Sequence, residues 1–145
     1  MKTYVSSGGV LYDPTQNKVC LICKIPRDEW ALPKGGVEKS ENLRESAMRE
    51  IQEETGYKDI ELKELLGKTE YELKDNEDKA FKIVYYYLAL LKTLEYVATP
   101  EQEKEELKSE WLSFEEAIKK AKYADTREFV RKTQLICEKG SGVSS

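Results

Sequence analysis

Three glutamates near the middle of the chain have the spacing of one helix face. Glu50, Glu53 and Glu54 stand at positions i, i+3 and i+4, so a helix through them brings their carboxylates together. Like charges at this spacing cost a helix about 0.2–0.5 kcal/mol per pair. The repulsion is relieved when a hard divalent cation lies among them, because Mg²⁺ prefers oxygen ligands. The cluster therefore predicts a magnesium site.

Two neighbouring features can complete this site. Arg49 lies four residues before Glu53 and eight after Glu41, so its guanidinium can brace the carboxylates. The stretch Lys34–Gly36 is expected to be a flexible turn that brings a backbone carbonyl close to the same face. Both features favour a function for the acidic helix face beyond solvation.

The helix that carries the cluster has its own start and stop signals. Asn42 is a plausible N-cap with Glu45 three residues later, and Gly56 follows the last turn, which predicts a helix over Leu43–Thr55. Around it we expect strands at Thr3–Tyr12, Lys18–Ile25, Trp30–Pro33, Ile60–Leu73, Ala80–Leu91 and Trp111–Leu112, an acidic loop at Glu101–Glu106, and helices at Ser113–Ala121 and Thr126–Glu138. This mixture predicts an α/β sandwich forming one domain over residues 1–139, with residues 140–145 as a flexible tail.

Composition excludes several classes of function. The 145 residues contain no histidine, which excludes Ser-His-Asp and Cys-His catalysis and His-ligated zinc. With a net charge of −4, a broad basic face for duplex nucleic acid is not expected. No apolar run approaches the roughly 20 residues of a membrane span. The start at Met1 leads directly into a strand pattern, so we expect neither membrane contact nor a secretory signal.

The cysteines point to a reducing compartment. Their number, three, is odd, which favours a reduced cytoplasmic chain. Cys20 and Cys23 form a C-x-x-C motif inside a strand-like run, where residues three apart face opposite sides. We therefore expect buried apolar cysteines and no shared metal.

The stretch from position 35 to position 57 resembles the Nudix box, G-x5-E-x7-R-E-U-x-E-E-x-G-U, where U is apolar. Its positions are filled by Gly35, Glu41, Arg49, Glu50, Ile51, Glu53, Glu54 and Gly56. The last position holds Tyr57, a mild departure that concerns packing and not chemistry. The preceding hairpin, the approach Trp30–Gly35 and the exit Trp111–Ala117 are also similar to the family, so the resemblance spans most of the chain.

The resemblance implies an α/β/α sandwich around a mixed β-sheet and hydrolysis of a nucleoside diphosphate linked to another moiety. It implies Mg²⁺ or Mn²⁺ as cofactor, with Glu50, Glu53, Glu54 and the Gly35 carbonyl as ligands. Arg49 would orient these carboxylates and Glu41 would pair with it. Family members differ in which glutamate is the base, and we favour Glu53 or Glu54 as ligand and base, together with a glutamate from the acidic loop.

Weaker patterns indicate further site residues. Glu105 lies six residues before Trp111, where several family members place an extra metal or base glutamate, although a solvated charged loop explains it equally well. Strand alternation puts Lys82 and Tyr86 on one face, where they could contact phosphate and stack on a base; a core aromatic is the alternative for Tyr86. Residues that flank the turn into the box and could bind polyphosphate are Arg27 and Lys34.

The expected partner is a small nucleotide, bound by a monomer or homodimer. The stretch Leu32–Gly36, the Lys82–Tyr86 strand and the exit look most like the dinucleoside tetraphosphate hydrolase branch, which implies cleavage of diadenosine tetraphosphate to ATP and AMP. A diphosphoinositol polyphosphate phosphohydrolase is the runner-up. A nucleoside triphosphate pyrophosphatase, an ADP-ribose hydrolase and an RNA 5′-end pyrophosphohydrolase stay open, as does a catalytically silent nucleotide-sensing module.

Overall fold

The sheet of this protein has seven strands that run in mixed directions. The computed structural model describes residues 1–144, and the side chains of residues 1–139. The strands are β1 (Lys2–Asp13), β2 (Lys18–Lys24), β3 (Glu29–Ala31), β4 (Lys34–Gly36), β5 (Ile60–Asp75), β6 (Asp78–Leu91) and β7 (Leu107–Leu112). They lie in the order β3-β2-β1-β6-β5, with β4 added to β1 and β7 to β2. Only the pair β1–β6 is parallel among these strands, so the sheet is mixed.

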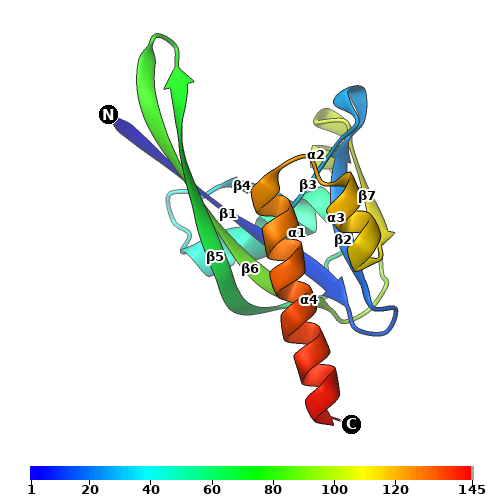
Figure 1. Ribbon diagram of the computed structural model, residues 1–145. Helices are drawn as coiled ribbons and strands as arrows, with labels where there is room; N and C mark the ends of the chain where they lie inside the picture. The colour runs from blue at the N-terminus through cyan, green and yellow to red at the C-terminus, as the bar shows by residue number, and fades with distance from the viewer. Residues whose placement is uncertain (145) are drawn as a thin grey trace.

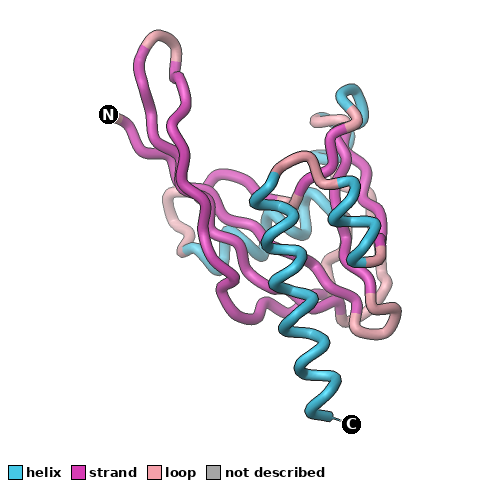
Figure 2. Tube along the Cα trace, in the orientation of Figure 1, coloured by secondary structure: helices cyan, strands magenta, loops and turns pink. Residues whose placement is uncertain are grey.

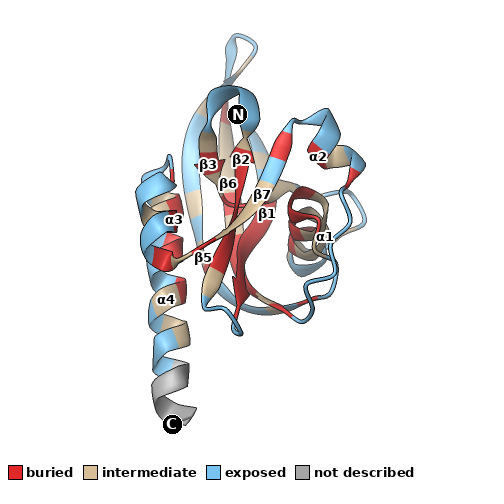
Figure 3. Cartoon of the chain, turned by 90° about the vertical axis from the view of Figure 1, so that its right-hand side faces the viewer, coloured by how far each residue is buried: buried red, intermediate tan, exposed pale blue. Residues whose placement is uncertain are grey.

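Helices cover both faces of the sheet. They are η1 (Ile25–Arg27), α1 (Leu43–Thr55), α2 (Pro100–Lys104), α3 (Phe114–Lys120) and α4 (Ala124–Ser144). Figure 3 shows α1 on one side of the sheet and α3 and α4 on the other. A small apolar core that includes Ile51 fills the α1 side, and a larger core that includes Phe129 fills the α3–α4 side. The expected α/β/α sandwich is confirmed.

Strands β5 and β6 form a hairpin that extends well beyond the body of the sheet (Figures 1 and 2). The first residues of β1 run alongside it, with Lys2 opposite Ala80 in the parallel pair. Much of this ribbon is exposed, and Tyr71 on β5 pairs with Lys82 on β6. The side chain of Tyr71, on this ribbon, lines the same cavity as Asp125 at the start of α4.

Three local expectations differ from the structure. The stretch Lys34–Gly36, expected to be a flexible turn, is strand β4, because it pairs with Ser6–Gly8 of β1. The expected acidic loop begins with helix α2, because Thr99 and Gln102 form a capping box around Pro100. The last helix was expected to end at Glu138, but its backbone is helical through Ser144. The division into a domain and a tail stays a prediction, and residue 145 lies outside the described residues.

The cysteines match a further expectation. Cys20 belongs to the core on the α1 side and Cys23 to the core on the α4 side, so the two thiols face opposite ways. Both are free and buried. Among the described residues, no helix combines the length and the hydrophobicity needed to cross a membrane.

Candidate active site

Local signals fix both ends of helix α1, which carries the clustered glutamates. Asn42 accepts from the Glu45 backbone N–H, and the Glu45 side chain accepts from the Asn42 N–H, so the capping box is complete. Gly56 ends the helix with a φ of 86°, a left-handed conformation that glycine adopts without strain. Ala47 and Ile51 are fully buried against the sheet. The face that carries the glutamates is therefore turned toward the chain segments around β4.

Arg49 lies at the centre of the charged face and binds the surrounding carboxylates. Its Nε and Nη2 atoms donate to the two oxygens of Glu41 at 2.6 and 2.9 Å, and this pairing lowers the pKa of Glu41 to about 2. Nη1 donates to Glu50 at 2.8 Å and to Glu53 at 3.1 Å. Nη2 also donates to the Gly36 carbonyl oxygen at 3.0 Å. One guanidinium thus offsets the repulsion among three carboxylates and ties them to β4.

Gly35 is the residue of β4 that lies against Glu50. A Cβ atom at position 35 would lie 1.5 Å from Glu50 Oε2, whereas a Cβ at Gly36 would meet nothing within 4 Å. Burial raises the pKa of the Glu50 carboxyl, which lies in this narrow space. The close approach of strand and helix is therefore built around the missing side chain of Gly35.

Glu54 is the most enclosed carboxylate of the cluster, with 8% of the residue exposed. Its Oε1 accepts the backbone N–H of Lys34 at 2.9 Å. Burial raises the pKa of Glu54 to about 8, with a smaller contribution from the charges of Glu50 and Glu105, while the Lys34 N–H acts in the opposite direction. A carboxylate with so little access to water gains strongly from a cation partner.

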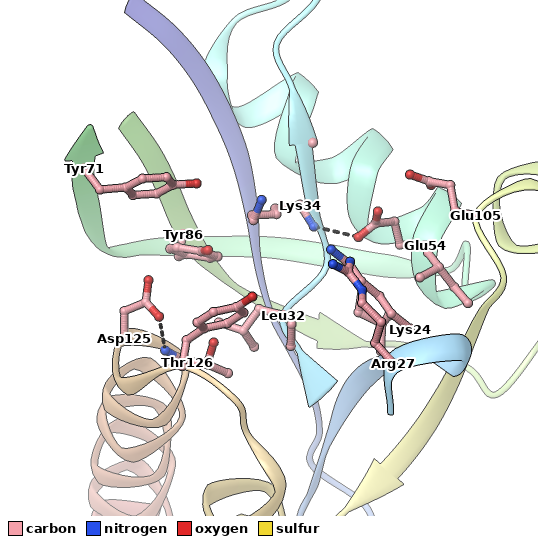
Figure 4. A pocket seen from close by; sticks show the side chains of 15 residues that line it. Lys24, Arg27, Leu32, Lys34, Glu54, Tyr71, Tyr86, Glu105, Asp125 and Thr126 are labelled. Atoms are coloured by element: carbon pink, nitrogen blue, oxygen red, sulfur yellow. Dashed lines mark hydrogen bonds between the residues drawn. The ribbon is translucent and has the colours of Figure 1, made fainter. Parts of the chain in front are cut away.

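A cavity of about 730 Å³ lies beside Glu54 (Figure 4). Glu54 and Glu105, from different elements, lie on the same side of it. Basic side chains, namely Lys24, Arg27 and Lys34, line it as well. Tyr71 and Tyr86 lie at the opposite end, beside Asp125. The cavity therefore joins an acidic and basic region, suited to a cation and phosphates, to an aromatic region suited to a ring.

The structure brings most of the predicted site residues to this place. Gly35, Glu54, Glu105, Arg27, Lys34 and Tyr86 all line the cavity. The other predicted site residues are not among the lining residues: Arg49, Glu50, Glu53 and Lys82. Desolvation lowers the pKa of the half-buried Lys34 amine, and the nearby charge of Lys82 lowers it further. Tyr86 has only 4% of its surface exposed and packs on Phe129 with ring centroids 4.9 Å apart. Most of its ring is thus occupied by core packing.

Sequence analysis missed nine cavity residues, of which four are charged or aromatic: Lys24, Tyr71, Tyr123 and Asp125. Tyr71 is 44% exposed and Tyr123 is 48% exposed, so both rings have surface available for a ligand. Tyr71 stands on the projecting ribbon, and Tyr123 precedes α4. Tyrosines close to predicted turns could have been noted as candidate ligand contacts. That Tyr71 and Tyr123 share a cavity with Glu54 follows only from the fold.

The donor chemistry fits a divalent cation. Glu50, Glu53 and Glu54 supply hard oxygen ligands, and the missing Cβ of Gly35 leaves β4 close to the Glu50 carboxylate. Over the described residues, no group of three or more carboxylate or thiolate side chains is already arranged to hold a metal ion. Glu50 and Glu53 accept hydrogen bonds from Arg49 instead.

The NUDIX domain family matches residues 2–133 of the chain. The chain belongs to the Nudix family. This confirms the resemblance read from the Gly35–Tyr57 stretch.

Relatives of this Nudix chain carry different substrate names. The asymmetrical bis(5′-nucleosyl)-tetraphosphatase of Rattus norvegicus is 34% identical over 109 residues, which cover 74% of this chain and 72% of the rat protein. The 8-oxo-(d)GTP phosphatase of Mycolicibacterium smegmatis is 31% identical over 125 residues, 86% of this chain and 36% of that protein. The chain covers only 36–63% of the length of seven curated relatives, the M. smegmatis protein among them.

A solved structure supports the same Nudix assignment over nearly the whole chain. The Ap4A hydrolase of C. elegans, in a binary complex, is similar with a TM-score of 0.70 and 25% sequence identity. The match covers 92% of this chain and 96% of that one. The arrangement of sheet and helices is therefore similar over most of both chains.

Proposed function

We propose that this Nudix hydrolase cleaves diadenosine tetraphosphate to ATP and AMP by attack of water on phosphorus. The observation that carries the proposal is the cavity, which joins carboxylates and basic side chains beside Glu54 to the exposed Tyr71 at its other end. The similarity to the rat and C. elegans enzymes supports the diadenosine class of substrate. Mg²⁺ as the ion, a cytoplasmic location and a monomer or homodimer belong to the same proposal.

Glu50, Glu53 and Glu54 would hold the cation, and the Gly35 carbonyl would be a further ligand. When bound, the cation offsets negative charge on phosphate oxygens and makes water more acidic. Arg49 orients Glu50 and Glu53 through its Nη1 atom. Its role is to keep these carboxylates together in the absence of the cation.

Glu105 is suited to take the proton of the attacking water. It is exposed at the cavity, and its carboxylate makes no hydrogen bond or ion pair with the described residues. The carboxylates of Glu53 and Glu54 are already engaged, by Arg49 and by the Lys34 N–H. A free carboxylate close to the cation site can act as a general base or as a further ligand. Glu53 and Glu54 remain the alternative bases.

The basic residues and the tyrosines would bind different parts of the substrate. Lys24, Arg27 and Lys34 line the cavity, where they would contact the phosphate chain. The exposed rings of Tyr71 and Tyr123 would stack on a nucleobase, a contact worth about 1–3 kcal/mol. Lys82 pairs with Tyr71 across the ribbon and would add positive charge near the same chain of phosphates.

A substrate panel tests the proposal. Diadenosine tetraphosphate, ATP, 8-oxo-dGTP, ADP-ribose, a diphosphoinositol polyphosphate and 5′-triphosphate RNA are incubated with the protein and Mg²⁺, and products are resolved by chromatography. We expect ATP and AMP from diadenosine tetraphosphate, with kcat/KM at least tenfold above the other substrates. Preference for a nucleoside triphosphate would instead favour the class named for the M. smegmatis relative. No hydrolysis of any substrate, with cation binding intact, would identify a nucleotide-sensing module.

A further inference from the structure

The last three residues of α1 offer their carbonyl oxygens to side chains from another part of the chain. The Glu53 carbonyl accepts from Thr99, the Glu54 carbonyl from Gln102 at 3.1 Å, and the Thr55 carbonyl from Ser109 at 2.7 Å. Carbonyls at a helix end have no partner within the helix, so these bonds fix the end of α1 to its surroundings. The residues that bear the predicted metal ligands are thereby attached to the segment around α2.

Gln102 is the most connected of these side chains, and it is only 5% exposed. Its Nε2 donates to the Glu54 carbonyl oxygen, while its Oε1 accepts the Thr99 backbone N–H at 3.0 Å and the Tyr96 hydroxyl at 3.3 Å. Its own N–H donates to Thr99 Oγ1 at 3.1 Å. Both ends of the carboxamide are thus used, so the side chain has one orientation that satisfies every partner.

The same short segment carries Glu105. Gln102 lies three residues before Glu105, and the Glu105 backbone N–H donates to the Glu101 carbonyl at 3.0 Å, which continues the turn of α2. On the far side, the Glu106 carbonyl accepts the Ile25 N–H at 3.0 Å. Glu105 is therefore held between an attachment to α1 and an attachment to the end of β2, and its side chain reaches the cavity on the Glu54 side (Figure 4).

We propose that Gln102 is a positioning residue whose buried carboxamide sets the place of Glu105 relative to Glu54, so that both carboxylates act on one divalent cation. The inference rests on the proposed function, because it concerns the cation that this activity uses. It goes further by assigning a role to a residue that touches neither the cation nor the substrate. Partners that orient metal-binding groups in this way typically change metal affinity about 10–100-fold when they are removed.

The choice of glutamine over glutamate at this position follows from the bond to α1. A capping box is completed equally well by either residue, since only an acceptor is needed for the Thr99 N–H. A glutamate has no N–H to donate, so it would leave the Glu54 carbonyl without its partner and would put a negative charge beside the negative end of the helix. The amide donor is therefore required by the link between α1 and α2, and not by α2 itself.

Mn²⁺ binding to the full chain, measured by titration calorimetry, tests the inference without relying on turnover. We expect Gln102→Met to weaken Mn²⁺ binding at least about tenfold. Gln102→Glu is the second variant, because it keeps the cap of α2. Its added charge by itself would strengthen cation binding, so weaker binding would show that position and not charge is responsible. Unchanged or tighter binding in both variants would overturn the inference.

Ser109→Ala is the matched control. It also removes one side-chain bond to a carbonyl at the end of α1, but Ser109 belongs to β7, which is paired with β2 along its length. We expect Ser109→Ala to lower the melting temperature while leaving the Mn²⁺ affinity within about twofold of the wild type, since it does not hold the Glu105 segment. If Ser109→Ala lost as much Mn²⁺ affinity, the effect of Gln102 would be explained by the stability of α1 alone, and the inference would be overturned.

A double-mutant cycle with Glu105→Gln identifies the residue through which Gln102 acts. If Gln102 acts by placing Glu105, then Gln102→Met changes Mn²⁺ affinity less than about threefold once the Glu105 carboxylate is gone. Losses that multiply, or a Glu105→Gln variant that binds Mn²⁺ as tightly as the wild type, would overturn the inference and leave Nudix hydrolysis intact. Conversely, a wild-type chain that binds Mn²⁺ but hydrolyses nothing would overturn the proposed function. The cycle could still be measured, because it depends on Mn²⁺ binding and not on turnover.

Discussion

Gly35 and Glu50 share a space that has no room for a side chain at position 35, since a Cβ there would lie 1.5 Å from Glu50 Oε2. The contact joins β4, held on β1 by backbone pairing, to the charged face of α1. Neither element can move away easily, because β1 lies in the middle of the sheet and Ile51 anchors α1 in the core. The position of the Glu50 carboxylate therefore depends on glycine at position 35.

Gly35→Ala should weaken cation binding and turnover together, each by at least about tenfold, because Glu50 must leave its place to admit the methyl group. Calorimetric titration with Mn²⁺ and steady-state assays with Mg²⁺ measure the two effects. Gly36→Ala is the matched control, since a Cβ there meets nothing within 4 Å. Equal behaviour of the two variants would show that the close approach has no part in the site.

Glu53→Gln and Glu54→Gln should each lower kcat by at least about 100-fold, because each removes a charge that holds the cation or takes a proton. Activity should also disappear in excess EDTA and return with Mg²⁺. Glu45→Gln is the control on the same helix: it lies in the capping box, which glutamine also completes, and should keep full activity. Near-wild-type kcat in both test variants would remove the cluster from the chemistry.

The parts of the site that sequence analysis predicted depend on local signals. Helix α1 begins and ends where Asn42 and Gly56 predict, because a capping side chain and a left-handed glycine act within one turn. The faces of β6 are also as predicted: Val84 and Tyr86 belong to the core on the α4 side, since side chains alternate along any strand. The contacts of Arg49 with Glu41 and Glu53 follow from their spacing on and beside the helix.

The parts that were missed depend on contacts between distant segments. Strand β4 has three residues and no pattern of its own, so only its pairing with Ser6–Gly8 makes it a strand. Helix α2 had a readable signal in Thr99, Pro100 and Gln102, but the charged run after it resembled a solvated loop. Tyr123 reaches the cavity because α3 and α4 pack on the sheet, which no local pattern specifies.

Glu54 should make the stability of the cation-free protein depend on pH. Its pKa in the folded protein, about 8, lies above the value of 4.5 expected for an unfolded chain. The folded state therefore binds the proton more tightly, and the stabilisation is complete below about pH 4.5 and lost as pH rises toward 8. Glu54→Gln stays neutral, so its melting temperature in EDTA should exceed that of the wild type by at least about 4 °C at pH 8.5.

The difference between variant and wild type is the quantity to follow, because other groups titrate too. Glu41, with its lowered pKa, contributes stability that is lost only as pH falls from about 4.5 toward 2, and it is common to both proteins. We expect the difference in melting temperature to approach zero at pH 5 and to grow steadily to pH 8.5. A constant difference across this range would contradict a raised pKa for Glu54.

Tyr86 should behave as a core residue more than as a binding residue. Its ring packs on Phe129 and is almost fully buried. Tyr86→Ala should therefore cost about 3–5 kcal/mol of unfolding free energy, the usual range for removing a buried ring. Tyr86→Phe keeps the packing, and should leave the binding of nucleotides within about threefold of the wild type. Chemical denaturation and a nucleotide titration separate the two effects.

Tyr71 and Tyr123 should instead decide how tightly a base is bound. Each ring is about half exposed at the cavity, so replacement by alanine removes a stacking surface without opening the core. We expect Tyr71→Ala and Tyr123→Ala each to weaken ATP binding by about 1–3 kcal/mol and to leave inorganic tripolyphosphate, which has no base, unaffected. Tyr85→Phe, on the opposite face of β6 from Tyr86, should change neither ligand. Equal losses for ATP and tripolyphosphate would show that the tyrosines shape the phosphate site, and the aromatic end of the cavity would then have no role in base recognition.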